Sequence, residues 1–221
     1  MASQGDCCEE QEEGRQMNQG TQEWFQARLG KVTASRVADL MAKTKSGSYA
    51  SSRDNYMAQL VLERLTNTQA ESYSNSYMQW GTEQEPFARA AYEASRGVMV
   101  EEVGFVPHPT IDAAGASPDG LVDDGMLEIK CPSSATMIEV LLTGNVEKKY
   151  FCQMQMQMAC TGRVWCDYVV FDPRMPLKVQ MFVKRIPRDI KFIAEMEAEI
   201  VKFLADVEAQ LKKLTQLIES K

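Results

Sequence analysis

The stretch that decides the fold reads Ser117-Pro118-Asp119-Gly120, Leu121-Val122-Asp123-Asp124-Gly125-Met126 and Leu127-Glu128-Ile129-Lys130-Cys131-Pro132. Two short apolar runs around a polar turn predict an antiparallel β-hairpin. Side chains alternate along a strand, so Glu128 and Lys130 share one face of the sheet while Ile129 faces the other. The hairpin can then bring Asp119 beside Glu128 and Lys130.

This juxtaposition favours metal-assisted chemistry. Two carboxylates side by side repel each other unless a cation lies between them. Hard oxygen ligands with free coordination positions suit Mg²⁺, and the backbone carbonyl of Ile129 can add another oxygen. Lys130 would lie next to a water on that ion and orient it. The set predicts phosphodiester hydrolysis, although Ser117–Gly120 alone is typical of a turn, and Glu128 and Lys130 alone are typical of a solvated strand face.

Composition limits the class of protein. The chain has 221 residues, 44% of them hydrophobic and 25% charged, as in an ordinary globular protein of one domain. No apolar run approaches the length of a membrane span, and the acidic N-terminus is unlike a signal or transit peptide. We expect a polar acidic tail over residues 1–20, a single domain over residues 21–221, and no membrane partner.

Charge is distributed unevenly along the chain. The formal net charge of −7 does not indicate a nucleic-acid binder. Residues 1–16 hold five acids and one base, whereas residues 28–53 hold six bases and one acid. The second segment is either a phosphate-binding patch or a solvated surface, and charge alone favours the surface.

Cysteine and histidine usage argues against two other kinds of site. The six cysteines include no C-x-x-C pair and His108 is the single histidine, so neither structural zinc nor a histidine-based nucleophilic triad is expected. We expect reduced, buried thiols, a structural His108 in a turn, and core packing for Met154, Met156 and Met158.

Hydrophobic periodicity predicts an α/β fold with a mixed sheet. The expected helices are Thr21–Leu29 with Trp24 and Phe25 inward, a helix capped by Thr33 or Ser35 and ending near Ala42, Asp54–Leu65, Gly81–Arg96, Lys148–Thr161, and a long C-terminal helix after Pro187. The expected strands are Val98–Val106, Leu121–Val122, Met126–Lys130, Val164–Phe171 and Leu177–Ile186. We expect an exposed, mobile loop at Lys43–Ser52.

The spacing Pro-Asp-(x)8-Glu-x-Lys resembles the PD-(D/E)XK signature of the restriction-endonuclease-like superfamily. The flanking segments resemble the lambda-exonuclease family of phage recombination nucleases in order and spacing. The matching segments are Trp24–Gly30, Thr33–Ser35, Trp80–Glu85, Ala116–Gly120, Leu127–Pro132, Tyr150–Gln155 and Phe171–Met175.

This resemblance implies a restriction-endonuclease-like core and a Mg²⁺-dependent exonuclease, with Mn²⁺ as an alternative ion and two ions per active site. It further implies a homotrimeric ring that degrades double-stranded DNA processively from 5′-phosphorylated ends, 5′→3′, releasing mononucleotides. The 3′ overhangs would serve a single-strand annealing recombinase in the cytoplasm of a bacterial or phage-infected cell.

The resemblance also assigns roles to individual residues. Asp119, Glu128 and the Ile129 carbonyl correspond to metal ligands, Lys130 to the water-activating residue, and Glu85 to an acid near the second metal. Gln153 corresponds to a helix residue at the active site, chosen by counting from Tyr150, with Gln155 and Gln157 left open. The substrate-binding set comprises a 5′-phosphate pocket of Arg28, Thr33, Ser35 and Ser117, the duplex-tracking Lys45 and the apolar wedge Met78.

Some of these residues also have a purely structural interpretation. Thr33 or Ser35 could cap a helix, Glu85 could lie on a helix surface, and Met78 could be a loop residue. Lys45 replaces an arginine that is frequent in the family, which keeps the charge but loses the guanidinium fork. Two alternatives to the exonuclease remain open. One is an endonuclease on the same core that is selective for DNA structure or sequence, and the other is a DNA-end-binding module without catalytic activity.

Overall fold

The computed structural model describes residues 17–70 and 76–220. Its elements in chain order are α1 (Gln22–Arg28), β1 (Val32–Thr33), the 3-10 helix η1 (Ala34–Arg36), α2 (Val37–Met41), α3 (Ser51–Thr66), α4 (Ser76–Arg96), β2 (Val106–Pro107), β3 (Ala114–Ala116), β4 (Gly120–Val122), β5 (Gly125–Lys130), α5 (Ser134–Thr143), α6 (Lys148–Thr161), β6 (Trp165–Phe171), the 3-10 helix η2 (Leu177–Val179), β7 (Met181–Pro187) and α7 (Ile190–Glu219).

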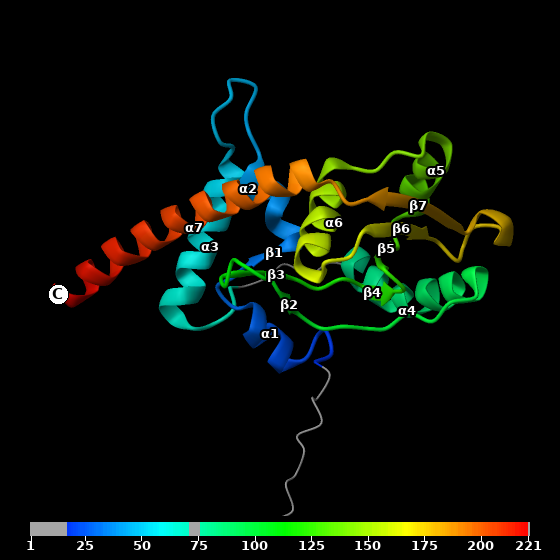
Figure 1. Cartoon of the computed structure of the whole chain (residues 1–221), viewed down its shortest axis with the longest axis horizontal. Helices are drawn as coiled ribbons and strands as arrows, with labels where there is room; N and C mark the ends of the chain where they lie inside the picture. Colours follow the sequence, from blue (N-terminus) through cyan, green and yellow to red (C-terminus); the bar gives the residue numbers. More distant parts are fainter. Residues whose placement is uncertain (1–16, 71–75, 221) are drawn as a thin grey trace, which may run out of the picture.

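The main sheet contains four strands in the order β4-β5-β6-β7. Strands β4 and β5 form the expected hairpin, with Val122 paired to Gly125. Strand β6 runs parallel to β5, and β7 returns antiparallel to β6. Helices flank this mixed sheet and α7 is long, which confirms the predicted α/β class (Figure 1).

Alternation along β5 and β6 divides the sheet between two apolar layers. The layer on one side joins the sheet to α5 and α6 through Met126, Cys166, Tyr168, Val170, Met137, Met154 and Met158. The layer on the other side joins it to α4 through Leu127, Ile129, Val169, Ala88 and Tyr92. Glu128 and Lys130 therefore lie on the α6 side, as the strand period predicts.

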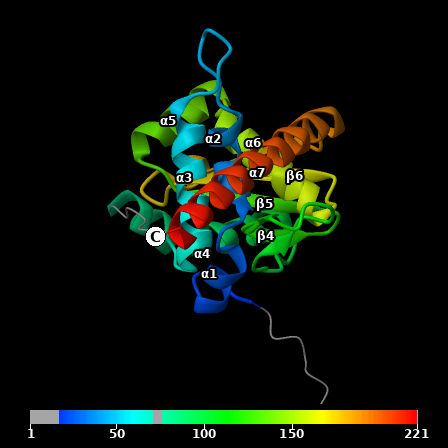
Figure 2. The same ribbon diagram turned by 90° about the vertical axis from the view of Figure 1, so that its left-hand side faces the viewer.

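Helix α6 is buried on two sides. Met154 and Met158 belong to the sheet layer, whereas Met156 belongs to a further cluster of α2, α3, α7 and the small sheet β1-β3-β2. All three methionines are fully buried, which confirms their predicted core role. Helix α7 crosses this helical layer next to α3 in both views (Figures 1 and 2).

The hairpin turn depends on a close contact. A Cβ atom at Gly125 would lie 2.2 Å from the indole ring of Trp165. The Trp165 indole N–H donates to Asp124 at 2.6 Å, and Asp123 adopts a positive φ of 48°. Glycine is thus required where β5 begins beside Trp165 of β6.

Several predicted elements were wrong in extent. Of the strand predicted at Val98–Val106, only Val106 pairs in β2, apart from one bridge at Glu101, because the short neighbouring strands leave most of the segment without a partner. Helix α5 was not predicted, and a 3-10 turn at Leu177–Val179 delays β7 to Met181. Helix α1 buries no residue, and Phe25 is 36% exposed.

His108 is structural, as predicted. It is buried and its Nε2 lies 3.1 Å from Glu197, while its Nδ1 accepts a hydrogen bond from the Thr110 N–H.

The described cysteines are free and buried, namely Cys131, Cys152, Cys160 and Cys166. Burial raises the thiol pKa of Cys131 and of Cys160 to about 12. Thiols with such raised pKa values are poor nucleophiles. Within residues 17–70 and 76–220, no helix combines the length and apolar character needed to cross a membrane.

Candidate active site

Asp119 lies immediately before β4 and completes the hairpin with its side chain. Its backbone N–H donates to the Leu127 carbonyl at 3.2 Å, and its Oδ2 accepts from the Ile129 N–H at 2.6 Å. The N–H and C=O of a strand residue point to the same side, so the Ile129 carbonyl also faces the side of Asp119. The carboxylate is therefore held at the end of β5.

Glu128 is fully buried beneath α6, and its two carboxylate oxygens have different partners. Oε1 accepts from Gln153 at 2.8 Å and forms an ion pair with the Lys130 amine. Oε2 accepts from Gln157 at 2.6 Å. The hairpin and α6 thus bring Asp119, Glu128, Lys130 and Gln153 to one end of the sheet.

The electrostatics show that these groups act on one another. Burial and the nearby Glu128 carboxylate raise the pKa of Asp119 well above its usual value. Burial alone would lower the pKa of Lys130, but the carboxylates of Glu128 and Asp119 outweigh it and raise that pKa. Lys130 is therefore an ammonium ion that is paired with Glu128 and also stabilised by the charge of Asp119, and the centre of the Tyr150 ring lies 5.2 Å from its nitrogen.

The donor set suits a hard cation. Two mutually repelling carboxylates and a carbonyl that faces the same end offer oxygen ligands, and in this state Lys130 supplies the compensating positive charge. Within the described residues, no three Asp, Glu, His or Cys side chains are already arranged around one metal position. Asp119, Glu128 and Ile129 are the residues that could hold the ion, and Lys130 or Gln153 would have to yield at Oε1.

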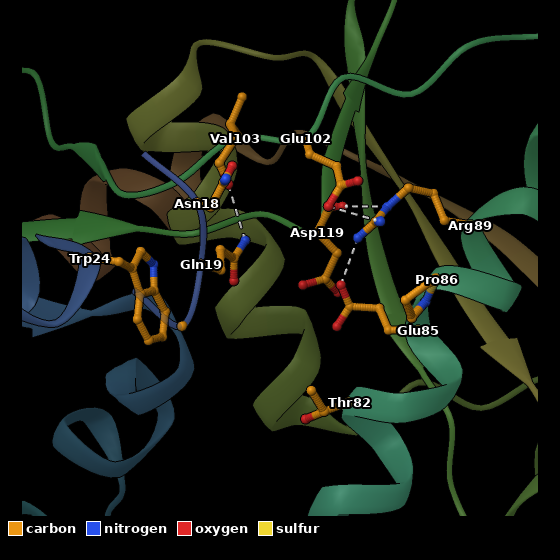
Figure 3. A pocket seen from close by; sticks show the side chains of 11 residues that line it. Asn18, Gln19, Trp24, Thr82, Glu85, Pro86, Arg89, Glu102, Val103 and Asp119 are labelled. Atoms are coloured by element: carbon orange, nitrogen blue, oxygen red, sulfur yellow. Dashed lines mark hydrogen bonds and ion pairs between the residues drawn. The ribbon is translucent and has the colours of Figure 1, made fainter. Parts of the chain in front are cut away.

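Glu85 lies on α4, and the figure shows its carboxylate directed toward that of Asp119 (Figure 3). Arg89, one turn later, binds Glu85 at 2.7 Å and Glu102 at 2.9 Å, and donates to the Asp119 carbonyl. Burial, the largest influence, raises the pKa of Glu85 despite the opposing charges of Arg89 and Lys130. Glu85 is thus at the site but is paired with Arg89.

All four residues predicted to bind the 5′ phosphate line one small pocket of about 190 Å³. The complete lining of this pocket is Gln19, Trp24, Arg28, Thr33, Ala34, Ser35, Ser117, Asp119 and Gln153. The guanidinium of Arg28 stacks 3.8 Å from the ring centre of Trp24, whose indole N–H donates to the Ser117 hydroxyl at 2.9 Å. Thr33 occupies the N-cap position of η1, as predicted, but its side chain makes no capping hydrogen bond. Arg36 takes the N-cap of α2, so Ser35 caps neither helix.

A larger pocket of about 480 Å³ adjoins the first, because both include Gln19, Trp24 and Asp119. Its other walls include Thr82, Glu85 and Arg89 of α4 and the segment at Glu102 (Figure 3). Asp119 therefore stands where the two pockets meet.

Two predicted substrate-binding residues lie apart from these pockets. Lys45 is exposed in the loop between α2 and α3, which projects from the body of the molecule (Figure 1). Met78 is 55% exposed in the first turn of α4. Neither side chain lines the two pockets at Asp119.

The predicted tail of residues 1–20 has its first sixteen residues outside the described range. The rest of that segment belongs to the site, because the Gln19 amide donates to the carbonyls of Pro118 at 2.9 Å and Val103 at 3.2 Å. The predicted boundary between tail and domain at residue 20 thus assigns Gln19 to the tail, although Gln19 lines both pockets.

Sequence reasoning missed Trp24, Arg89 and Gln19 as parts of the site, and it left Gln157 open as an alternative to Gln153. Two of them carry a signal in their spacing, since Gln157 follows Gln153 and Arg89 follows Glu85 by one helical turn. Gln155, left open beside Gln153, faces elsewhere and bonds to Pro187 and Asp189.

Comparison with known proteins gives a consistent result. A domain described as YqaJ-like viral recombinase matches residues 23–164, well over half of the chain. The crystal structure of an alkaline exonuclease, LHK-Exo from Laribacter hongkongensis, shares 54% identity with a TM-score of 0.84, covering 90% of this chain and 99% of that one. Its complex with dAMP has a TM-score of 0.85 at the same identity and coverage.

A phage-related exonuclease from Haemophilus somnus 129PT shares the fold, with a TM-score of 0.61 at 16% identity over 85% of this chain and 96% of that one. No curated protein matches the chain. The family match and the 54% identity agree with the resemblance read from the sequence blocks. The chain belongs to the YqaJ-like viral recombinase domain family, within the lambda-exonuclease family.

Proposed function

We propose that the protein is a divalent-metal-dependent exonuclease that degrades double-stranded DNA processively from 5′-phosphorylated ends in the 5′→3′ direction. It would release mononucleotides and leave 3′ single-stranded overhangs in the cytoplasm of a bacterial or phage-infected cell. Membership of a recombinase family and 54% identity to an alkaline exonuclease support hydrolysis of DNA. The dAMP bound to that relative is a nucleoside monophosphate, the kind of product proposed here.

The observation that carries the proposal is the small pocket shared by Arg28, Thr33, Ser35, Ser117, Asp119 and Gln153. A guanidinium and three hydroxyl groups suit a terminal phosphate. Asp119 lies on the wall of the same pocket. A phosphate anchored there would set the scissile bond about one nucleotide away, and each cut would create the next 5′ phosphate. This arrangement accounts for both polarity and processivity.

Asp119, Glu128 and the Ile129 carbonyl would hold Mg²⁺ or Mn²⁺, with Glu85 next to a second ion. When bound, such ions would offset negative charge on the scissile phosphate. Lys130, whose raised pKa keeps it protonated, would orient the attacking water through its N–H groups. Gln153 holds Glu128 Oε1 at 2.8 Å and would restrict where that oxygen can move.

Family membership supports a proposal for the assembly. We propose a homotrimeric ring that encloses the duplex, with Lys45 tracking the DNA backbone and Met78 inserted at the terminal base pair. The overhang would pass to a single-strand annealing recombinase.

The test compares linear and covalently closed plasmid DNA, with Mg²⁺ or EDTA, and resolves the products by length. We expect mononucleotides from linear DNA with Mg²⁺, an intact closed circle, and no degradation by Asp119→Ala. Cleavage of the closed circle would indicate an endonuclease instead. Binding of ends without degradation would indicate an end-binding module.

A further inference from the structure

Gln157 is a fully buried polar residue in α6 that no role above explains. Its amide nitrogen donates to Glu128 Oε2 at 2.6 Å and lies 3.4 Å from the Ser117 carbonyl. One side chain thus connects the buried acid of the hydrolytic site to the segment that carries the phosphate-pocket hydroxyl.

The two oxygens of Glu128 are held differently. Oε1 meets the Lys130 amine and the Gln153 amide, both of which reach the site from partly exposed positions. Oε2 is held by Gln157 from the fully buried side of α6. Lys130 or Gln153 can therefore yield to an incoming cation at Oε1 while Gln157 keeps the carboxylate oriented through Oε2.

The orientation of the Gln157 amide is fixed by its neighbours. Glu128 Oε2 and the Ser117 carbonyl are both acceptors, so the nitrogen must face them. The amide oxygen is then buried without a hydrogen-bond partner in the part of the chain that the structure describes. A buried acceptor without a partner lowers the stability of the fold. The presence of Gln157 at this position is therefore better explained by its role in holding Glu128 than by a contribution to stability.

Helix geometry separates Gln157 from its neighbour Gln155. Gln153 and Gln157 are four residues apart and both reach Glu128. Gln155 is equally buried but bonds to the Pro187 carbonyl and the Asp189 N–H, away from the site. The same helix therefore provides a matched control.

We propose that Gln157 is a positioning residue that anchors Glu128 through Oε2, presents Oε1 to the divalent cation, and keeps that acid in register with Ser117. The inference rests on the proposed function, because it assigns Glu128 as a metal ligand. Removing a partner that orients a metal ligand typically weakens metal binding by about 10- to 100-fold.

The test measures Mn²⁺ binding without DNA, by calorimetry, for the wild type, Gln157→Leu, Gln157→Asn and Gln155→Leu. Gln157→Asn keeps the amide but is one methylene shorter, so it serves if the leucine variant does not fold. We expect both Gln157 variants to bind Mn²⁺ about 10- to 100-fold more weakly. We expect Gln155→Leu to lower the melting temperature while keeping wild-type affinity.

The outcomes separate two kinds of failure. Wild-type Mn²⁺ affinity in a folded Gln157 variant would overturn the inference and leave the proposed function standing. An equal loss of affinity in Gln155→Leu would also overturn it, because the effect would then be a general loosening of α6. Absence of Mn²⁺ binding and of DNA degradation in the wild type would overturn the proposed function itself.

Discussion

The carboxylate of Asp119 accepts a hydrogen bond from the Ile129 N–H at 2.6 Å, so a side chain continues the hairpin ladder where the backbone of β4 has not yet begun. This contact places the acid at the end of β5 and thereby next to Glu128 and Lys130. Structure and charge at Asp119 are consequently separable, since an amide oxygen can replace the acceptor without replacing the charge.

Asp119→Asn keeps an acceptor for Ile129 and removes one of two repelling carboxylates. We expect DNA degradation and stabilisation by Mg²⁺ to be lost, while the melting temperature without divalent ions rises by a few degrees, at roughly 2–4 °C per kcal/mol for a chain of this size. Asp119→Ala lacks the acceptor and should melt lower than Asp119→Asn. Thermal melts with and without Mg²⁺ check this, and equal destabilisation by both variants would contradict it.

Lys130→Ala should abolish hydrolysis while leaving most DNA binding intact. The change also leaves the Glu128 charge buried, which costs about 3 kcal/mol for a buried pair and less here because the Lys130 side chain is 26% exposed. Saturating Mg²⁺ should recover part of that loss, because a cation replaces the ammonium. Denaturant melts and DNA-binding titrations measure both effects. Near wild-type turnover would refute the role of Lys130.

Arg28→Ala should remove the preference for a 5′ phosphate. In the wild type, an unphosphorylated linear end should initiate about 10- to 100-fold more slowly, since hydrogen bonds to charged groups contribute about 1.5–3 kcal/mol. Initiation by Arg28→Ala should be equally slow on both ends. Arg36→Ala is the control, because Arg36 bonds to Asp39 and Gln59 outside the pocket and should keep the preference. Equal wild-type rates on the two ends would count against the pocket.

Gly125→Ala tests the turn that brings the site together. The added Cβ atom would lie 2.2 Å from the Trp165 ring, so the ring or the strand must shift. Overpacking of this kind costs about 1–3 kcal/mol. Chemical denaturation should report that loss. Gly144→Ala supplies a comparison, because its Cβ atom meets no atom within 4 Å and only the positive φ of 61° opposes the change.

The hairpin and the placement of its acids were predictable because they depend on local rules. A two-residue turn fixes the register of β4 against β5, and strand alternation fixes the face of Glu128 and Lys130. The capping glycine of α6, Gly162 at a φ of 72°, likewise ended that helix where predicted.

The errors concern features that depend on distant partners. Apolar alternation at Val98–Val106 suggests a strand, but most of that segment lacks a neighbour with which to pair. Gln19 reaches the site only because the chain returns 99 residues later at Pro118. Helical spacing could have indicated Gln157, yet which face of α6 meets Glu128 is set by packing between two cores.

Lys45 provides a test of whether the projecting loop between α2 and α3 follows the DNA backbone. The side chain is exposed and lies outside both pockets at Asp119, so its substitution should leave the chemistry at the end of β5 unchanged. One lost phosphate contact should lower the slope of log K against log salt by about 0.9. We therefore expect Lys45→Ala to weaken DNA binding and shorten processive runs at moderate salt, with the same turnover at saturating DNA and the same 5′-phosphate preference. Salt titrations of binding measure the slope, and an unchanged slope would place Lys45 away from the duplex. Lys45→Arg should keep the wild-type slope, because the contact with phosphate requires only the positive charge.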